Sequence, residues 1–255
     1  MPVSPPLQST QPAESPTRRS PAPRVRAVLL DAHGTLLGLK PPAPALRALL
    51  AARFGIGVSL AQAEAAIAAE IRYYRAHLHE GRDERSVDDL RGRCSEVLRH
   101  ALAAEHLLDG VGVGELTQTL LAALEFHPYP EVPDVLERLR ARGIRLVVAS
   151  NWDASLPHTL RALGLLEHLD GVVTSAECGA PKPEPPVFER ALELAAVPAS
   201  AALHVGDSRE EDVLGARRAG VEAVLISRQP GPPAPGVRSI SSLRELLGLP
   251  ELEGP

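Results

Sequence analysis

The sequence has few aromatic residues and almost no cysteine. Phe, Trp and Tyr make up only 3% of the 255 residues, so a folded core must be built mainly from Leu, Val and Ala. Cys94 and Cys178 stand far apart, with no CxxC pair and no histidine at ligand spacing, which gives no zinc signature and no disulfide framework. The simplest expectation is a protein of the reducing cytoplasm.

Long apolar runs and basic stretches are also missing. No run approaches the roughly 20 residues that a membrane-spanning helix needs, and the N-terminus lacks the apolar segment of a secretory signal. The formal net charge is −5, whereas a nucleic-acid-binding domain usually carries a basic stripe or patch. We therefore expect neither a membrane nor a nucleic acid as partner, and the sequence leaves the oligomeric state open.

Five short apolar runs begin after a polar leader. Residues 1–24 are rich in Pro, Ser and Thr and have no apolar period, which predicts a disordered Pro-rich tail. The runs are VRAVLL (25–30), IRLVVA (144–149), GVVT (171–174), ALHV (202–205) and AVLI (223–226). Short, β-branched and nearly continuous runs are typical of parallel strands that are buried on both faces. Helical patterns separate the later runs, and the alternation predicts an α/β fold with a Rossmann-like parallel sheet core.

One stretch, from about 40 to 127, shows helical spacing only. Apolar stripes with steps of three and four residues run along 60–78, 87–101 and 116–124. Ser86 is the expected N-cap of the second stripe. Short helices with one apolar stripe bury it against one another, so we expect an inserted all-α helical cap domain over 40–127. The α/β core would then comprise 25–39 and 128–249, with a last helix over 241–249.

Polar residues stand where four of the predicted strands end. The carboxyl ends of parallel strands share one edge of a sheet, and ligands bind there. The residues are Asp31, His33 and Thr35 after the first strand, Ser150 and Asn151 after the second, Lys182 after the third, and Asp207 and Asp212 after the fourth. We expect these side chains to meet at one site.

These residue types suit phosphoryl transfer. A carboxylate can attack phosphorus and form an aspartyl-phosphate intermediate. Three converging aspartates would repel one another, and Mg²⁺, with its octahedral shell of oxygen ligands, would relieve the repulsion and neutralise phosphoryl charge. Ser150 and Asn151 would donate hydrogen bonds to the phosphoryl oxygens, and Lys182 would add a fixed positive charge. Gly34 and Gly206 would let the backbone approach the ligand closely.

Four segments resemble the ordered motifs of the haloacid dehalogenase superfamily. They are DAHGTL, VVASN, the KP of APKPEP, and VGDSREED. The inserted helices resemble the helical type-1 cap of its dehalogenase and phosphoglycolate phosphatase members, and the resemblance extends over 25–249. It implies that Asp31 is the nucleophile, that Asp207 is a metal ligand, and that Asp212 supports or joins the metal shell.

The same resemblance implies further roles. Lys182 would order the nucleophile and the phosphate, and Ser150 would bind the phosphate. Thr35 is grouped with the phosphate-binding residues. The second metal ligand of the first motif would be the backbone carbonyl of His33, so the side chain at that position is not needed for the contact.

His33 departs from the family's pattern. Phosphatases of the superfamily usually carry Asp two residues after the nucleophile as general acid and base, whereas dehalogenases usually carry an aromatic residue there. The GDxxxxD of 206–212 resembles the metal-dependent phosphatases instead. A histidine side chain ordinarily changes charge near neutral pH, so His33 could serve as the acid and base. Otherwise the leaving group would take its proton from water or from the substrate.

Three functions follow from this pattern. The leading one is Mg²⁺-dependent hydrolysis of a small phosphomonoester through an aspartyl-phosphate. The alternatives are a metal-independent 2-haloacid dehalogenase-like hydrolase and a catalytically impaired binding or regulatory protein of the same fold. Trp152 and Asp153 are candidates for lining the crevice. Candidate substrate selectors in the cap are Tyr73, Arg75, His77, His79 and Arg82, although a charge-rich helix face is usually just solvated.

Overall fold

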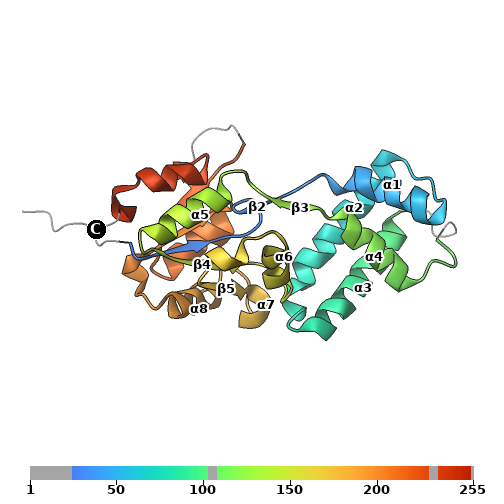
Figure 1. Cartoon of the computed structure of the whole chain (residues 1–255). Coiled ribbons are helices and arrows are strands. Elements are labelled where there is room, and N and C mark those ends of the chain that lie inside the picture. Colours follow the sequence, from blue (N-terminus) through green and yellow to red (C-terminus); the bar gives the residue numbers. More distant parts are fainter. Residues whose placement is uncertain (1–24, 103–107, 230–234, 254–255) are drawn as a thin grey trace, which may run out of the picture.

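The computed structural model describes residues 25–102, 108–229 and 235–253. It contains a sheet lobe and a separate group of helices joined to it by two adjacent segments (Figure 1). The predicted disordered tail, residues 1–24, lies outside the described residues. Within the described ranges no helix combines the length and the apolarity that crossing a lipid bilayer requires.

A six-stranded parallel sheet forms the centre of the sheet lobe. Its order is β5-β4-β1-β6-β7-β8, and every neighbouring pair is parallel. The strands are β1 (Ala27–Leu30), β4 (Arg145–Ser150), β5 (Gly171–Thr174), β6 (Ala202–Gly206), β7 (Glu222–Ile226) and β8 (Ser239–Ile240). The five predicted strands are all present, so the α/β sheet expected from the sequence is confirmed.

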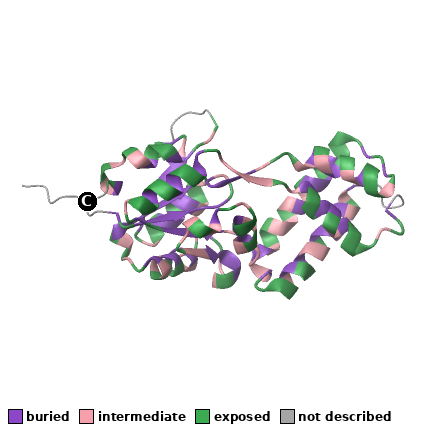
Figure 2. Ribbon diagram, in the orientation of Figure 1, coloured by how far each residue is buried: buried purple, intermediate pink, exposed green. Residues whose placement is uncertain are grey.

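Two apolar layers cover the two faces of the sheet. Successive side chains of a strand point to opposite faces, and β1 obeys this rule: Val28 and Leu30 belong to one buried cluster, while Ala27 and Leu29 belong to the other. All four are fully buried, and buried residues concentrate on the strands in Figure 2. The covering helices are α5 (Val132–Ala141), α6 (Leu156–Ala162), α7 (Ser175–Cys178), α8 (Pro186–Ala195) and α9 (Gly215–Arg218).

Short helical turns complete the sheet lobe. They are η3 (Leu166–His168), η4 (Ala199–Ala201), η5 (Arg209–Leu214), η6 (Leu243–Gly248) and η7 (Pro250–Leu252). The helix expected over 241–249 is thus a 3₁₀ segment, η6. The segment after β6 begins as the π-helical turn η5 and continues as α9. Such turns are frequent at functional sites, and η5 carries Asp212.

A group of four helices, the helical insertion, follows the first strands. Its members are α1 (Pro42–Phe54), α2 (Leu60–His77), α3 (Glu84–Ala101) and α4 (Val113–Ala123), with the short turn η1 (Leu78–Glu80) between α2 and α3. They bury an apolar cluster of their own, which confirms the predicted helical insertion. The expected N-cap was wrong: Asp83 caps α3 by accepting from the Ser86 amide at 2.9 Å, and the Ser86 hydroxyl is its capping-box partner.

A two-stranded antiparallel ribbon connects the helical insertion to the sheet lobe. It pairs β2 (Leu37–Leu39) with β3 (Phe126–Pro128). The sequence predicted helices alone as far as residue 127, so β3 is a difference from that expectation. Strands of three residues are too short for a period to be recognised. The proposed domain boundary at 39/40 lies at the end of β2, and the one at 127/128 lies within β3.

Candidate active site

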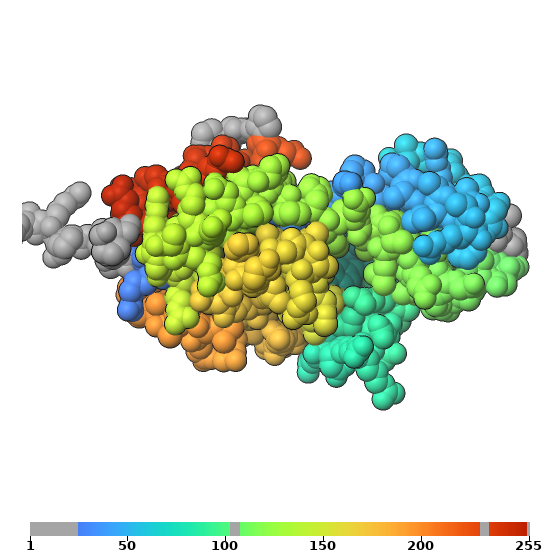
Figure 3. Space-filling view, viewed as in Figure 1, coloured from blue at the N-terminus to red at the C-terminus, as the bar shows by residue number. Residues whose placement is uncertain are grey.

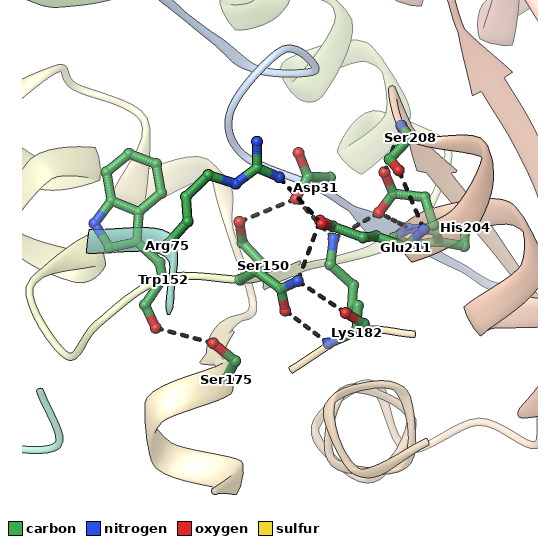
Figure 4. Close-up of polar contacts among 11 residues, drawn as sticks. Asp31, Arg75, Ser150, Trp152, Ser175, Lys182, His204, Ser208 and Glu211 are labelled. Carbon is green, nitrogen blue, oxygen red and sulfur yellow. Dashed lines mark hydrogen bonds and ion pairs between the residues drawn. The ribbon is translucent and has the colours of Figure 1, made fainter. Parts of the chain in front are cut away.

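Five of the predicted site residues meet at the carboxyl edge of the sheet, and Figure 4 shows Asp31, Ser150 and Lys182 among them. Asp31 follows β1, and its Oδ1 accepts a hydrogen bond from Ser150 Oγ, at the end of β4, at 3.0 Å. Lys182 Nζ donates to Asp31 Oδ1 at 2.7 Å and to Asp212 Oδ1 at 2.5 Å. Oxygen atoms of Asp31, Asp207 and Asp212 all lie within 4.8 Å of one another. The convergence follows from the parallel topology, which places these strand ends side by side.

Lys182 is a buried cation between two carboxylates. Its side chain is 1% exposed. Burial opposes its charge, but the carboxylates of Asp31 and Asp212 outweigh burial and raise the pKa of Lys182. Burial raises the pKa of Asp31 despite the attraction of Lys182. Lys182 therefore stays charged and holds the predicted nucleophile in one orientation.

Asp207 carries the uncompensated charge of the site. It is exposed to solvent, yet desolvation by its surroundings and the charges of Asp31 and Asp212 raise its pKa from 3.8 to about 7. A divalent cation would remove this repulsion. Mg²⁺ takes oxygen ligands at about 2.1 Å, so ligands on opposite sides of the ion lie about 4.2 Å apart. The all-oxygen donor set and its spacing therefore fit Mg²⁺.

Asp212 is fixed by three donors. Its Oδ1 accepts from Lys182 and lies 2.9 Å from His204 Nε2, and its Oδ2 accepts from the Ser208 amide at 2.9 Å. Burial disfavours its charge, but Lys182 and His204 outweigh burial and hold the pKa of Asp212 below its usual range. These bonds favour the supporting role over direct coordination. The sequence did not single out His204, because it lies inside an apolar strand.

Two glycines leave room for these carboxylates. A Cβ on Gly34, whose φ is +83°, would lie 2.0 Å from Asp207 Oδ2. A Cβ on Gly206 would lie 2.1 Å from Asp212 Cγ. We expected both glycines to leave room for the ligand. In the structure they leave room for the side chains of Asp207 and Asp212 instead.

The predicted phosphate contact of Asn151 is not supported by its hydrogen bonds. Its Nδ2 donates to the Lys182 carbonyl at 3.0 Å and to Glu211 Oε2 at 3.1 Å, and its Oδ1 accepts from the Lys182 amide at 2.7 Å. Both amide protons are thus used. Asn151 secures the backbone of Lys182 rather than presenting a free donor to a phosphate.

Thr35 and His33 occupy different environments. Thr35 lies in a tight turn closed by hydrogen bonds from Leu36 and Leu37 to the Ala32 carbonyl, and its side chain is fully buried. It does not line the cavity described below, so its expected phosphate contact is also not supported. His33 is exposed, lines that cavity and meets the edge of Phe126 with ring centroids 6.4 Å apart.

A cavity of about 900 Å³ lies over these residues, between the sheet lobe and the helical insertion. The space-filling view shows a hollow at this junction (Figure 3). Trp152 and Asp153 line it as expected. Of the five candidate selectors only Arg75 does so, and its neighbours on α2 are Glu70, Ile71 and Tyr74. The sequence missed Glu70, although a lone carboxylate within the apolar stripe of α2 was a visible signal.

Three contacts join the helical insertion to the sheet lobe beside the cavity. Tyr74 Oη donates to Asp153 Oδ2 at 3.1 Å. The Ala154 amide donates to the Gly81 carbonyl at 2.8 Å. Arg75 Nη2 donates to Glu211 Oε1 at 3.1 Å, and Figure 4 shows this side chain reaching across the site. The cavity is therefore roofed by α2.

The family model of the haloacid dehalogenase-like hydrolases matches residues 25–220. The chain belongs to this family. It is 41% identical over 127 residues to haloacid dehalogenase-like hydrolase domain-containing protein 3 of Bos taurus, covering 47% of this chain and 50% of the relative. It is 36% identical over 139 residues to a phosphoserine phosphatase of Thermus thermophilus, covering 52% and 55%. The chain thus spans about half the length of these curated relatives.

A solved structure has a similar fold over most of both chains. The crystal structure of a 2-haloacid dehalogenase from Pseudomonas syringae pv. Tomato superposes with a TM-score of 0.62 and 28% identity. The match covers 88% of this chain and 97% of that one. Because phosphatases and dehalogenases both occur among the similar proteins, the reaction must be argued from the site.

Proposed function

We propose that this haloacid dehalogenase-like hydrolase is a Mg²⁺-dependent phosphatase that hydrolyses a small phosphomonoester through an aspartyl-phosphate on Asp31. The observation that carries the proposal is the group of three aspartates within 4.8 Å of one another around Lys182. A dehalogenase that works without metal has no need of the charge that Asp207 adds. Similarity to phosphatases supports the same reaction class.

Asp31 attacks through the oxygen that is left available. Ser150 and Lys182 both donate to Oδ1, and no donor among the described residues is hydrogen-bonded to Oδ2. Attack by Oδ2 forms the bond to phosphorus while the ester oxygen leaves. Water then cleaves the aspartyl-phosphate and releases inorganic phosphate, which regenerates the carboxylate. Ser150 and Lys182 hold the attacking carboxylate in place throughout, and the charge of Lys182 also stabilises negative charge on the transferred group.

Proton transfer falls to His33 in this proposal. Its side chain lines the cavity close to the nucleophile's strand end. An imidazolium there donates a proton to the leaving alkoxide, and the resulting neutral ring takes a proton from the attacking water. The side chain thus takes the place of the carboxylic acid that phosphatases of the superfamily usually carry.

Asp31, Asp207 and the backbone carbonyl of His33 would hold the metal, with Asp212 supporting them. When bound, Mg²⁺ neutralises negative charge on the carboxylates and on the phosphoryl oxygens. The reliance on oxygen ligands suits this hard cation.

The test is phosphate release from a panel of phosphomonoesters by the full chain, with Mg²⁺ or with EDTA. We expect turnover only with Mg²⁺, and its loss in Asp31→Asn. Asp134→Asn, on an exposed part of α5, is the matched control and should remain active. Halide release from 2-halo acids in EDTA would favour the dehalogenase alternative instead. Absence of phosphate release from the whole panel would overturn the proposal.

A further inference from the structure

Glu70 is a buried carboxylate in the roof of the cavity. It lies on α2 and is 5% exposed. Its neighbours on the buried face of the helix are apolar, namely Ala63, Ala66 and Ile67. It nevertheless lines the same cavity as the aspartates of the sheet lobe. A side chain of this kind is costly to bury unless its charge is compensated.

No protein cation compensates Glu70 within the described residues. Its one hydrogen-bonding partner there is the Cys94 thiol on α3. Burial and the Glu70 charge raise the pKa of Cys94 to about 12, so the thiol stays neutral and is a weak donor. Burial also raises the pKa of Glu70 itself. A thiol donates only one hydrogen bond, so the other acceptor sites of the Glu70 side chain, which lines the cavity, stay open to a ligand.

Nearby arginines are engaged elsewhere. Arg93 Nη2 donates to Glu80 at 2.6 Å, and Arg75 is bonded to Glu211. Arg91 lines the cavity, and its Nη1 lies 3.8 Å from Asp88. None of these arginines forms an ion pair with Glu70, so a cation on the molecule that fills the cavity can pair with it and favour its ionised form.

We propose that Glu70 binds a cationic amine on the leaving group of the substrate, so that the site selects aminoalkyl phosphate esters. The inference rests on the proposed phosphatase function. The phosphate lies at Asp31 and the ammonium lies against Glu70. The alkyl chain between them contacts the apolar wall formed by Ile71, Leu120 and Leu124. Glu70 is a specificity-determining residue that takes no part in bond cleavage.

Esters that differ in one group test the assignment. Phosphoethanolamine is paired with propyl phosphate, and aminopropyl and aminobutyl phosphates are paired with the alkyl esters in which methyl replaces ammonium. We expect the best amino ester to exceed its partner about tenfold or more in kcat/KM, as a charged hydrogen bond warrants. Glu70→Gln should collapse this ratio towards one. Glu64→Gln, at an exposed position of the same helix, should preserve it.

Binding separates this inference from the phosphatase proposal. Aminoalkylphosphonates and alkylphosphonates of the same lengths cannot be hydrolysed at an ester bond, and their affinities are measured by calorimetry with Mg²⁺. Tighter binding of the amino compound to wild type but not to Glu70→Gln supports the amine site even if no ester is turned over. The amine site is overturned if the two members of every pair have equal affinity and equal kcat/KM. It is also overturned if Glu70→Gln leaves the preference for the amino compound unchanged.

Discussion

Tyr74 on the helical insertion donates a hydrogen bond to Asp153 in the sheet lobe at 3.1 Å, and Asp153 is only 2% exposed. The neighbouring pair between Arg75 and Glu211 has side chains 66% and 32% exposed. Both join the same two parts of the molecule beside the cavity, but they differ in burial. Removing a partner from a buried carboxylate leaves it unsatisfied, whereas water replaces the partner at an exposed one.

The buried contact should therefore matter more than the exposed one. We expect Tyr74→Phe to lower the free energy of unfolding by about 1–3 kcal/mol, and Arg75→Gln by less than about 1 kcal/mol. Urea denaturation of both variants measures the difference. A larger loss in Arg75→Gln than in Tyr74→Phe would contradict this ranking of the two contacts.

Lys182 should be a structural requirement as well as a site residue. Lys182→Met leaves the buried carboxylates of Asp31 and Asp212 uncompensated, and breaking a buried pair in this way costs about 3–5 kcal/mol. The chain's other lysine is the control: Lys40 forms an ion pair with Glu125, and its side chain is 56% exposed. Lys40→Met should cost less than about 1 kcal/mol. Comparable losses in the two variants, measured by denaturation at neutral pH without Mg²⁺, would refute the proposed charge balance.

The raised pKa of Asp207 predicts how pH affects the metal-free protein. In the unfolded chain Asp207 has its ordinary pKa of 3.8, and in the folded protein its pKa is about 7. At a pH between these two pKa values, folding is accompanied by the uptake of a proton at Asp207. The contribution of this group to the free energy of unfolding therefore falls as pH rises from about 4 through 7. Mg²⁺ binds the ionised form, so the stabilisation it gives should grow over the same range.

Thermal unfolding midpoints across that pH range, in EDTA and in Mg²⁺, check the prediction. Other groups titrate there too, so the informative quantity is the difference between wild type and Asp207→Asn. We expect the variant in EDTA to gain stability relative to wild type as pH rises, and to lose most of the response to Mg²⁺. A difference that does not change with pH would show that Asp207 is ionised throughout.

The sequence could predict the strands and the meeting of their acidic ends, because both depend on local pattern and on the shared edge of a parallel sheet. Asp31, Lys182 and Asp212 were found in this way. The hydrogen-bond partners of the Asn151 side-chain amide could not be predicted, because one of them is the Lys182 carbonyl, 31 residues away in the chain. Thr35 was expected among the phosphate-binding residues, and nothing in the sequence indicated that its side chain would be fully buried in the turn that Leu36 and Leu37 close on Ala32.

Residues missed by the sequence share one property. Glu70 lies on the apolar face of α2, and His204 lies in the apolar strand β6. The role of a polar residue at such a position depends on the groups that pack against it in the fold. His204 faces Asp212, and Glu70 faces the cavity. The ribbon of β2 and β3 was missed because its strands of three residues have no detectable period. Local pattern thus located the side chains that converge, while tertiary packing determined which residues support them and which cover the cavity.

In the proposed reaction, His33 supplies the proton that the leaving group takes up. If His33 donates the proton, His33→Ala should lower kcat for alkyl phosphates by about 10²–10⁴-fold, the usual contribution of a general acid and base. p-Nitrophenyl phosphate needs less help, because p-nitrophenolate is stable without a proton, so its first step should be much less affected. The size of the burst of p-nitrophenol in rapid-mixing experiments reports that step separately from hydrolysis of the aspartyl-phosphate. Equal losses in kcat for the two kinds of ester, with no burst, would assign the leaving group's proton to water or to the substrate. His33→Asp is the complementary variant: a carboxyl group there should retain the alkyl phosphatase activity that alanine loses.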